Sequence, residues 1–416
     1  MVDWDDHYAG RVSRMAGSEI RELLKLLDQP DIISFAGGIP DPTLFPLNEI
    51  AAAHAAILAD PARGGAALQY SVSEGYLPLR EWLVDYMATL GVPCTPDNIV
   101  ITNGSQQALD FLGKLFIGPG DKVLVSRPTY LGALQAFNPY EPTYDVLPGP
   151  DNNRTVESFG VAGGASGPRL GYVMPEFRNP TGTSLTLAER HELLAVADAL
   201  DLPLIEDSAY EKLRYDGEAV PSLLALEAAR TGGVDHGRVI YCGTFSKTIV
   251  PALRVGWIVG PRSVIRKLVL TKQASDLHSS TLNQMVMHEV ASRTLMAQVG
   301  NIRASYKARR DAMLSALERY MPDGVTWTRP EGGMFIWVTL PDGFDSGVLL
   351  RQAITEARVA FVPGRAFFAD GSGQNTLRLS FSLAAPDKGT EGIRRLGTLL
   401  CRLIEEVQPV AAAARA

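Results

Sequence analysis

Cysteine is scarce in this sequence, with only three residues in a chain of 416. Three scattered cysteines make neither a disulfide framework nor a zinc site, and the six histidines show no spacing typical of metal ligands. We therefore expect reduced thiols and no bound metal. Basic residues are also in the minority, because 39 Lys and Arg face 46 Asp and Glu. A net charge of −7 argues against a general nucleic-acid binder and gives no reason to expect binding to an anionic membrane surface.

Long apolar runs are missing as well. No run is long enough to span a bilayer, and residues 1–6 are acidic where a signal peptide would be basic. The expectation is therefore a cytoplasmic protein. What the sequence does contain is ordinary globular composition: 46% of its residues are hydrophobic and 20% are charged, which is enough apolar material for a large core.

Short apolar runs alternate with amphipathic segments through the middle of the chain. Helical patterns such as Gln106–Leu115 and Leu187–Leu200 lie between several of the runs. This alternation predicts an α/β fold with a mostly parallel sheet covered on both faces. Ligands of such sheets bind at the carboxyl ends of the strands. The apolar runs are Ile99–Ile101, Val123–Val125, Leu170–Met174, Leu202–Ile205, Val239–Cys242 and Gly256–Val259.

Both ends of the chain depart from this alternation. Arg11–Leu27 has the pattern of a helix, and a Gly/Pro-rich stretch, Phe35–Pro42, follows it. A long helical stretch from Val264 to about Tyr320 precedes a second group of short strands, Met334–Val338 and Leu377–Phe381. We therefore expect three parts, which are an N-terminal helix and arm that join the small domain (1–45), a large domain (46–300) and a small C-terminal domain (301–416).

A lysine lies among small hydroxyl residues directly after one of the apolar runs, in the segment Thr244–Arg254. Hydroxyls and a basic residue at a strand end make a good phosphate cradle. Lys247 can form a Schiff base with a carbonyl cofactor there if its amine is partly desolvated. Arg254 could add a bidentate contact to a phosphate. Taken alone, the motif also fits a solvated loop lysine.

Two carboxylates end another apolar run, in the segment Leu202–Tyr210. Asp207 stands where a cofactor would lie, and a carboxylate that faces a pyridine nitrogen keeps this nitrogen protonated, so that the ring accepts electrons. Tyr210 could reach a phenolic oxygen on such a ring. Taken alone, Asp207 and Ser208 fit a helix N-cap at least as well.

Three weaker signals lie at other strand ends. The turn Thr102–Gln107 presents backbone N–H groups to an anion at a helix N-terminus. Asn179 precedes Pro180, which keeps it out of the helical region and leaves its amide free to donate. Arg378 sits on an apolar strand and suits a bidentate grip on a carboxylate. A common βα turn, a turn asparagine and a surface arginine are the alternatives, but none explains why these elements occur together.

With these elements combined, the sequence resembles the fold-type I, aspartate aminotransferase-like pyridoxal phosphate enzymes, and most closely their 2-aminoadipate/kynurenine aminotransferase branch. The resemblance extends from about Arg14 to Leu396. It implies a three-layer α/β aminotransferase fold, with a mostly parallel central sheet in the large, pyridoxal phosphate-binding domain and a smaller α+β domain. It rests on the segments Ser34–Pro40, Leu68–Gly75, Gly104–Leu109, Arg178–Gly182, Glu206–Tyr210, Gly243–Lys247 and Gly332–Trp337.

The resemblance implies roles for the residues around the cofactor ring. Lys247 would be the Schiff-base lysine, which also carries a proton between the substrate Cα and the cofactor C4′. Asp207 would pair with the pyridinium nitrogen. Tyr210 and Asn179 would contact the ring oxygen, and Tyr130 would stack on the ring. The phosphate would be held by Gly104, Ser105, Gln106, Thr244, Ser246 and Arg254.

The resemblance also implies a partner subunit and a substrate site. Tyr70 would reach the phosphate of the neighbouring subunit, which makes the active unit a homodimer with shared active sites. Arg378 would grip the substrate α-carboxylate, with help from Asn179 and the backbone near Gly38. Arg21 takes the place of an arginine that reads an acidic side chain in the 2-aminoadipate enzymes. A surface helix arginine is the alternative for Arg21.

The implied function is amino-group transfer from an L-amino acid to a 2-oxo acid such as 2-oxoglutarate, in ping-pong fashion. The implied donors are 2-aminoadipate, glutamate, and aromatic or branched-chain amino acids. A lyase or decarboxylase of the same fold would share Lys247 and Asp207. An effector domain of a transcription regulator is a third reading, which we disfavour because the motifs begin by Phe35 and leave no room for a DNA-binding module ahead of them.

Overall fold

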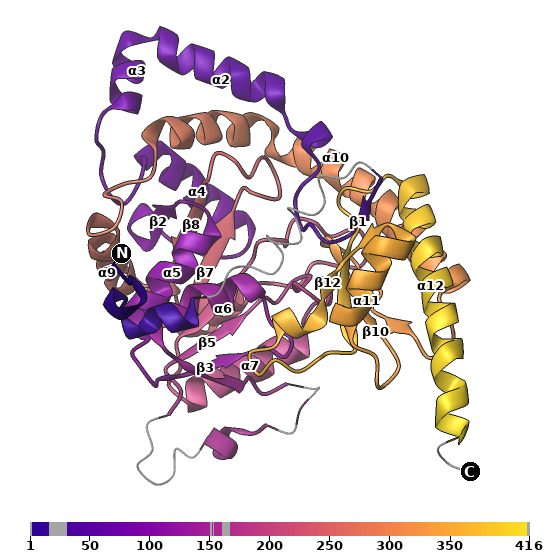
Figure 1. Ribbon diagram of the computed structural model, residues 1–416. Coiled ribbons are helices and arrows are strands. Elements are labelled where there is room, and N and C mark those ends of the chain that lie inside the picture. The colour runs from indigo at the N-terminus through magenta and orange to yellow at the C-terminus, as the bar shows by residue number, and fades with distance from the viewer. Residues whose placement is uncertain (1, 16–30, 150–151, 153, 160–166, 414–416) are drawn as a thin grey trace.

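The computed structural model of the protein describes residues 2–15, 31–149, 152, 154–159 and 167–413. Its larger part is built on a seven-stranded sheet (Figure 1). Only β8 runs antiparallel to its neighbours, β2 and β7, and all the other pairs are parallel. The sheet is therefore mostly parallel. In spatial order its strands are β2 (Ile99–Thr102), β8 (Gly256–Val259), β7 (Val239–Thr244), β6 (Leu204–Asp207), β5 (Leu170–Val173), β3 (Lys122–Val125) and β4 (Thr143–Val146).

Helices cover both faces of this sheet and complete three layers. Successive strand residues belong to opposite clusters of the core, so that Ile205 packs with one layer of helices and Leu204 with the other. The first layer contains α5 (Ser105–Phe116), α6 (Leu131–Phe137) and α9 (Arg262–Gln273). The second contains α2 (Leu47–Ala59), α3 (Pro61–Leu68), α4 (Leu77–Thr89), α7 (Leu187–Ala199), α8 (Leu223–Thr231) and the first half of α10 (Thr281–Tyr320).

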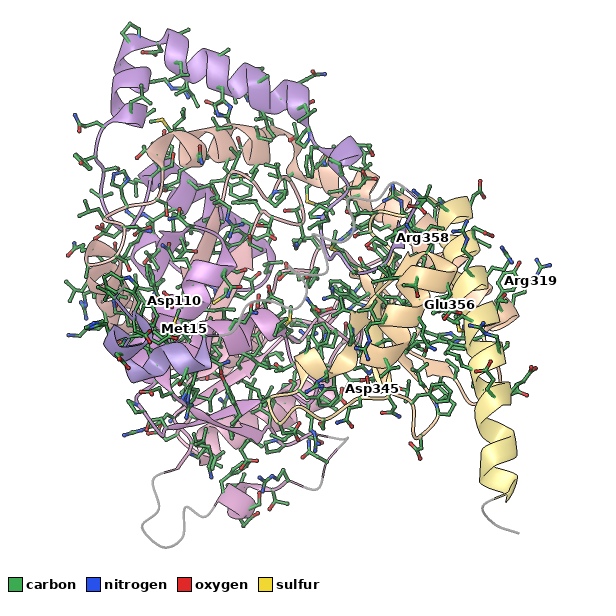
Figure 2. All side chains as sticks on the ribbon, viewed as in Figure 1. Met15, Asp110, Arg319, Asp345, Glu356 and Arg358 are labelled. Carbon is green, nitrogen blue, oxygen red and sulfur yellow. The ribbon has the colours of Figure 1, made fainter. Side chains whose placement is uncertain are left out.

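A smaller α+β part follows at the C-terminal end of the chain, drawn in orange and yellow in Figure 1. Helix α10 runs on into it and packs against α12 (Pro386–Ala413). The sheet order is β12 (Val362–Pro363), β13 (Thr376–Ser380), β10 (Phe335–Thr339) and β9 (Thr326–Trp327). Helix α11 (Ser346–Gln352) lies beside it, capped by Asp345 (Figure 2), which accepts hydrogen bonds from the backbone N–H groups of Gly347 and Val348.

The N-terminal segment contacts both parts. Strand β1 (Ile33–Ser34) pairs in parallel with β11 (Val359–Ala360) of the smaller part. Ahead of it, η2 (Gly10–Arg14) packs on η5 (Asn138–Tyr140), and Figure 2 shows the following Met15 on the same side of the molecule as Asp110 of α5. The other short helices are η1 (Asp5–His7), η3 (Pro42–Leu44), η4 (Pro96–Asn98), η6 (Val156–Phe159), η7 (Val234–His236), η8 (Ala353–Ala357) and η9 (Gly364–Phe367).

The structure corrects some of the predicted elements. The long helical stretch from Val264 is two helices, because Leu277 adopts a left-handed φ of 61° and Ser280 caps a new helix. Strand β4 was not predicted, since its sequence, Thr-Tyr-Asp-Val, lacks an apolar run and lies at the sheet edge. The predicted helix Arg11–Leu27 begins as the 3₁₀ turn η2, which ends at Arg14; Met15 is not helical, and residues 16–27 lie outside the described residues. Among the described helices, none is long and apolar enough to cross a membrane.

Candidate active site

A cavity of about 990 Å³ opens where the strands of the large sheet end, and η9 and β13 of the smaller part close its other side. Of the predicted site residues, Gly104 lies directly behind its wall, Tyr70 is 80% exposed and does not line it, and Arg21 lies outside the described residues. The predicted residues that the structure brings together around the cavity are Gly38, Ser105, Gln106, Tyr130, Asn179, Asp207, Tyr210, Thr244, Ser246, Lys247, Arg254 and Arg378.

Asp207 ends strand β6 and is almost fully buried. The hydroxyl of Tyr172 donates a hydrogen bond of 2.9 Å to its Oδ2 atom. Its Oδ1 atom is buried and has no hydrogen-bond partner among the residues that the structure describes. Burial raises the pKa of Asp207 to about 6, although the hydrogen bond from Tyr172 and the positive charge of Lys247 oppose the shift. A donor placed against Oδ1 would satisfy this oxygen.

The helix-cap alternative for Asp207 does not hold, because no helix begins there. The neighbouring carboxylate serves a helix instead. Glu206 points to the opposite face of the sheet and accepts hydrogen bonds of 2.9 Å from the backbone N–H groups of Leu223 and Leu224, at the start of α8. Burial raises the pKa of Glu206 to about 7. Because successive strand residues point to opposite faces of the sheet, Glu206 binds the start of α8 and Asp207 faces the cavity.

Lys247 follows strand β7 and is half-buried at the cavity wall. Its Nζ atom donates a hydrogen bond of 3.1 Å to the carbonyl of Gly38. Desolvation lowers the pKa of Lys247 to about 8, the positive charges of Arg254 and Arg378 add to the shift, and Asp207 opposes it. A substantial fraction of the amine is then neutral near physiological pH, which is the form that attacks a carbonyl.

Three segments meet at one end of the cavity and present donors. Ser105 begins helix α5, whose N-terminus attracts anions. The hydroxyls of Thr244 and Ser246 lie 2.9 Å apart. Arg254 adopts a left-handed φ of 55°, which costs a non-glycine residue about 1–2 kcal/mol. Gly104 must remain glycine, because its φ is 74° and a Cβ atom would lie 2.4 Å from the Arg254 guanidinium.

Arg378 lies on β13 across the cavity and is 1% exposed. Its Nη1 atom donates to Asn179 Oδ1 at 2.8 Å, and its Nη2 atom donates to the Ala36 carbonyl at 2.7 Å. Its guanidinium lies 4.3 Å from the ring centre of Phe335 and 5.1 Å from that of Phe367. Burial lowers its pKa to about 10, so it stays charged at neutral pH. An arginine fixed in this way is prepared to bind an anion.

Two aromatic residues complete the wall. Tyr210 is buried with its ring edge-on to Phe335, and burial raises its pKa above the usual tyrosine range, so its hydroxyl remains a donor. Tyr130 precedes α6, and its ring lies against Gly132, where a Cβ atom would come within 2.4 Å of the ring. Gln106 ties α5 to α6, since its Nε2 atom donates to the Gly132 carbonyl at 2.7 Å.

These groups fit pyridoxal phosphate. The donors around Ser105 and Arg254 suit its phosphate, and Lys247 supplies an amine for its aldehyde. The discriminating observation is the unpaired Oδ1 atom of Asp207, because a protonated pyridine nitrogen is the donor that this buried oxygen lacks. Among the described residues, no group of three or more His, Cys, Asp or Glu side chains could hold a metal ion.

Sequence reasoning missed three residues of this site. Tyr172 was counted as a member of the apolar run Leu170–Met174, although a tyrosine within such a run was a signal that could have been used. Arg14 and Arg365 also line the cavity. Arg14 donates from Nη1 to the Pro142 carbonyl at 2.8 Å, and Arg365 is an exposed residue of η9. No sequence pattern marked either arginine.

Comparisons with known proteins agree with this geometry. The family model "Aminotransferase class I and II" matches residues 31–396. An aromatic-amino-acid aminotransferase of Thermococcus litoralis is 42% identical, over 95% of this chain and 94% of its own length. A 2-aminoadipate transaminase of Thermus thermophilus is also 42% identical, over 97% and 98%. A crystal structure of a Pyrococcus horikoshii kynurenine aminotransferase in complex with PMP, KYN and KYA is 43% identical and covers 97% of this chain and 98% of that one, with a TM-score of 0.88.

Proposed function

Because the chain belongs to the class I and II aminotransferase family and is a pyridoxal phosphate-dependent aminotransferase, we propose that it moves the amino group of acidic, aromatic and branched-chain L-amino acids to a 2-oxo acid such as 2-oxoglutarate, in ping-pong fashion. The observation that carries the proposal is the placement of Lys247, Asp207 and Arg378 around one cavity. A lyase of the same fold is not favoured, since the two relatives at 42% identity are aminotransferases.

Five side chains act at the reacting end of the cavity. When bound, pyridoxal phosphate supplies a carbonyl that captures amino groups and a ring that accepts the electron pair left at the substrate Cα. Lys247 would hold the cofactor through its amine. Once the amino group of the substrate has taken this place, the released amine would take the proton from Cα, and its lowered pKa leaves part of it neutral near neutral pH. Asp207 holds a proton on the pyridine nitrogen. Tyr210 and Asn179 donate to the ring oxygen, and Tyr130 stacks on the ring.

The other residues of the site bind and orient the substrate and the cofactor phosphate. Arg378 binds the α-carboxylate of the amino acid, assisted by Asn179, whose Oδ1 atom already fixes the guanidinium at 2.8 Å. The Gly38 backbone lies beside them and accepts from Lys247. The phosphate is held by Gly104, Ser105, Gln106, Thr244, Ser246 and Arg254.

The charge of the cavity favours substrates with a second carboxylate. Cations among its lining residues exceed carboxylates by four. The cofactor phosphate, with roughly two negative charges, and one α-carboxylate leave a positive surplus. Arg14 and Arg365 are the cations that bind neither the phosphate nor the α-carboxylate. Arg21 remains the residue that the sequence predicts to bind an acidic side chain of the substrate. The names of the relatives, which include 2-aminoadipate and aromatic aminotransferases, support both acidic and aromatic donors. The side-chain charges on the lining are those of Arg14, Lys247, Arg254, Arg365, Arg378 and Asp207.

We further propose that the active unit is a homodimer in which Tyr70 reaches the phosphate of the neighbouring subunit. Its 80% exposure in the single chain supports a contact outside this chain.

We also propose that the chain divides into an N-terminal arm (1–45), a large domain (46–300) and a small domain (301–416). We propose the cytoplasm as the location of the protein, because its three cysteines are free thiols, which persist in reducing compartments.

A single-turnover experiment tests the proposed reaction. Purified holoenzyme is mixed with one amino acid at a time, without any oxo-acid acceptor, and the released 2-oxo acid is quantified. We expect about one equivalent per active site from acidic and aromatic donors, because a ping-pong enzyme stops after its first half-reaction. Continuous release of oxo acid and ammonia would indicate a lyase, and no release from any common donor would contradict transamination.

Steady-state kinetics of the Arg21→Ala variant, with an oxo-acid acceptor present, test the side-chain prediction. We expect KM to rise about tenfold or more for glutamate and 2-aminoadipate, the scale of a lost hydrogen bond to a charged group, with little change for phenylalanine. Equal losses for acidic and aromatic donors would show that Arg21 does not read the side chain.

A further inference from the structure

A partly buried polar cluster lies behind the phosphate end of the cavity, and none of the roles above uses it. Its centre is Lys272, in the last turn of α9, whose side chain is fully buried. The Nζ atom of Lys272 lies 3.1 and 3.0 Å from the two carboxylate oxygens of Asp276, 3.2 Å from Gln107 Oε1 and 3.0 Å from Ser279 Oγ. A buried ammonium is costly unless it is paired and hydrogen-bonded in this way.

The carboxylate of this ion pair also holds the turn that precedes α5. Asp276 Oδ2 accepts hydrogen bonds from Asn103 Nδ2 at 2.7 Å and from Gln107 Nε2 at 2.8 Å. The backbone N–H of Asn103 donates to Gln107 Oε1 at 2.8 Å. Both ends of the turn are therefore tied to one ion pair, in which Lys272 is buried and Asp276 is partly exposed. The three residues between them, 104–106, are those that face the cavity or its wall.

The same turn is connected to the cation at the phosphate end. The carbonyl of Asn103 accepts a hydrogen bond of 3.1 Å from Arg254 Nη2. Gly256 packs against the backbone of this turn and has no room for a side chain, since a Cβ atom there would lie 2.8 Å from the carbonyl carbon of Gly104. Asn103 thus links Arg254, which faces the cavity, with Asp276, which does not.

We propose that the Lys272–Asp276 ion pair positions the phosphate-binding turn of this enzyme. Asp276 orients Asn103 and Gln107, and these fix the N-terminus of α5 and the guanidinium of Arg254 for the cofactor phosphate. Lys272 and Asp276 are positioning residues, because neither lines the cavity. The inference rests on the assignment of pyridoxal phosphate as the cofactor.

Two ligands that differ only in the phosphate separate this role from a general contribution to folding. Apoprotein of the wild type and of Asp276→Asn is titrated with pyridoxal phosphate and with pyridoxal, and binding is followed by the absorbance of the bound ligand. In the variant we expect the Kd of pyridoxal phosphate to rise about tenfold, the lower end of what partners behind metal ligands contribute. The Kd of pyridoxal should stay within about twofold, because it makes no phosphate contact.

A matched control is Glu391→Gln, which removes the carboxylate of another i,i+4 ion pair, with Arg395 on the surface of α12. It should change neither Kd. If Asp276→Asn does not fold, Asn103→Ala removes only the donor from the turn and is judged by the same ratio of affinities.

An equal loss for both ligands, or no loss for either, would overturn the proposal. A wild-type protein that binds pyridoxal and pyridoxal phosphate equally well would contradict the cofactor assignment instead. The thermal unfolding of each apoprotein is recorded in parallel, so that a ligand-independent loss of stability is recognised.

Discussion

At the scale of single residues, one physical cause shifts the pKa values of Asp207 and Lys247 in opposite directions. Burial raises the pKa of Asp207 to about 6 and lowers the pKa of Lys247 to about 8, because desolvation penalises the charged form of each. Without a ligand, the ionised carboxylate of Asp207 therefore lowers the free energy of unfolding at neutral pH, and a protonated pyridine nitrogen would offset this loss. The effect can be measured by unfolding the apoprotein.

Asp207→Asn should make the apoprotein more stable and the enzyme much less active. The pKa of Asp207 is raised from the usual 3.8 to about 6. Its ionisation therefore destabilises the fold increasingly as the pH rises through this interval, and fully above it. A neutral isostere removes a cost of up to about 3 kcal/mol. Urea unfolding at pH 5 and pH 8 should show the larger gain at pH 8, whereas the half-reaction rate falls at least about a hundredfold, as for other lost electrostatic partners.

The control for this prediction is Asp323→Asn, at an exposed carboxylate, which should alter stability by less than about 0.5 kcal/mol and leave the rate unchanged. A variant at position 207 that is less stable than the wild type at pH 8 would show that Asp207 is ionised and favourably paired in the apoprotein.

At the scale of elements, an irregular segment joins the two parts of the molecule at the cavity. The N–H of Phe35 donates to the carbonyl of Ala360 at 2.7 Å, and its own carbonyl accepts from the N–H of Ser380, the last residue of β13, at 2.8 Å. Three residues later, Gly38 accepts from Lys247 of the large part. The segment therefore sets the distance between Lys247 and the strand that bears Arg378.

Gly38→Ala should disturb this packing and weaken the binding of amino acids. A Cβ atom at residue 38 would lie 2.7 and 2.9 Å from ring atoms of Phe335, the ring that supports the Arg378 guanidinium. We expect KM for amino donors to rise about tenfold or more, since displacements of about 1 Å in a substrate site have large effects. Overpacking should lower the unfolding free energy by about 1–3 kcal/mol. Steady-state kinetics and urea unfolding provide the measurements.

Gly300→Ala is the matched control, because nothing lies within 4 Å of a Cβ atom there and the residue is inside α10. It should be neutral or stabilising by up to about 1 kcal/mol. An unchanged KM in Gly38→Ala would mean that the segment does not set the position of Arg378.

At the scale of the whole molecule, exposed apolar side chains gather near Tyr70. Leu68, Tyr70 and Val72 are 72%, 80% and 55% exposed, and Leu277 is 52% exposed. The ring of Tyr70 meets the ring of His278 edge-on at 6.0 Å, which places these two segments side by side. Apolar residues grouped on a surface commonly mark an interface. The grouping supports the proposed homodimer.

A hybrid dimer tests whether Tyr70 acts across subunits. Lys247→Ala should be inactive, and Tyr70→Phe should lose cofactor affinity about tenfold or more, the scale of a hydrogen bond to a charged group. If Tyr70 serves the neighbouring site, a hybrid of the two variants contains one site with both native residues. Mixing the variants by unfolding and refolding should then restore activity at limiting cofactor, up to one native site per hybrid.

No recovery after mixing would place Tyr70 in its own site, and a monomer in sedimentation experiments would exclude the shared site altogether. Separately refolded variants, mixed afterwards, are the control for exchange of subunits.

Much of the fold and of the candidate site followed from local patterns. The apolar runs predicted the strands at the centre of the sheet, because strands buried on both faces are continuously apolar, whereas the edge strand β4 carried no such signal. The polar residues placed at strand ends predicted Lys247, Asp207 and Asn179, which the structure brings to one cavity. Their chemical roles remain predictions.

The sequence by itself determined where the reacting groups stand, since a lysine, a carboxylate and a hydroxyl-rich turn at the ends of parallel strands must meet at one edge of the sheet. The tertiary structure decided what surrounds them. Only folding places Tyr172 on Asp207, buries Arg378 between aromatic rings and ties Asp276 to the turn before α5. These contacts join residues that are distant in the chain, and burial, which sets the pKa values of Asp207 and Lys247, depends on packing that no local pattern contains.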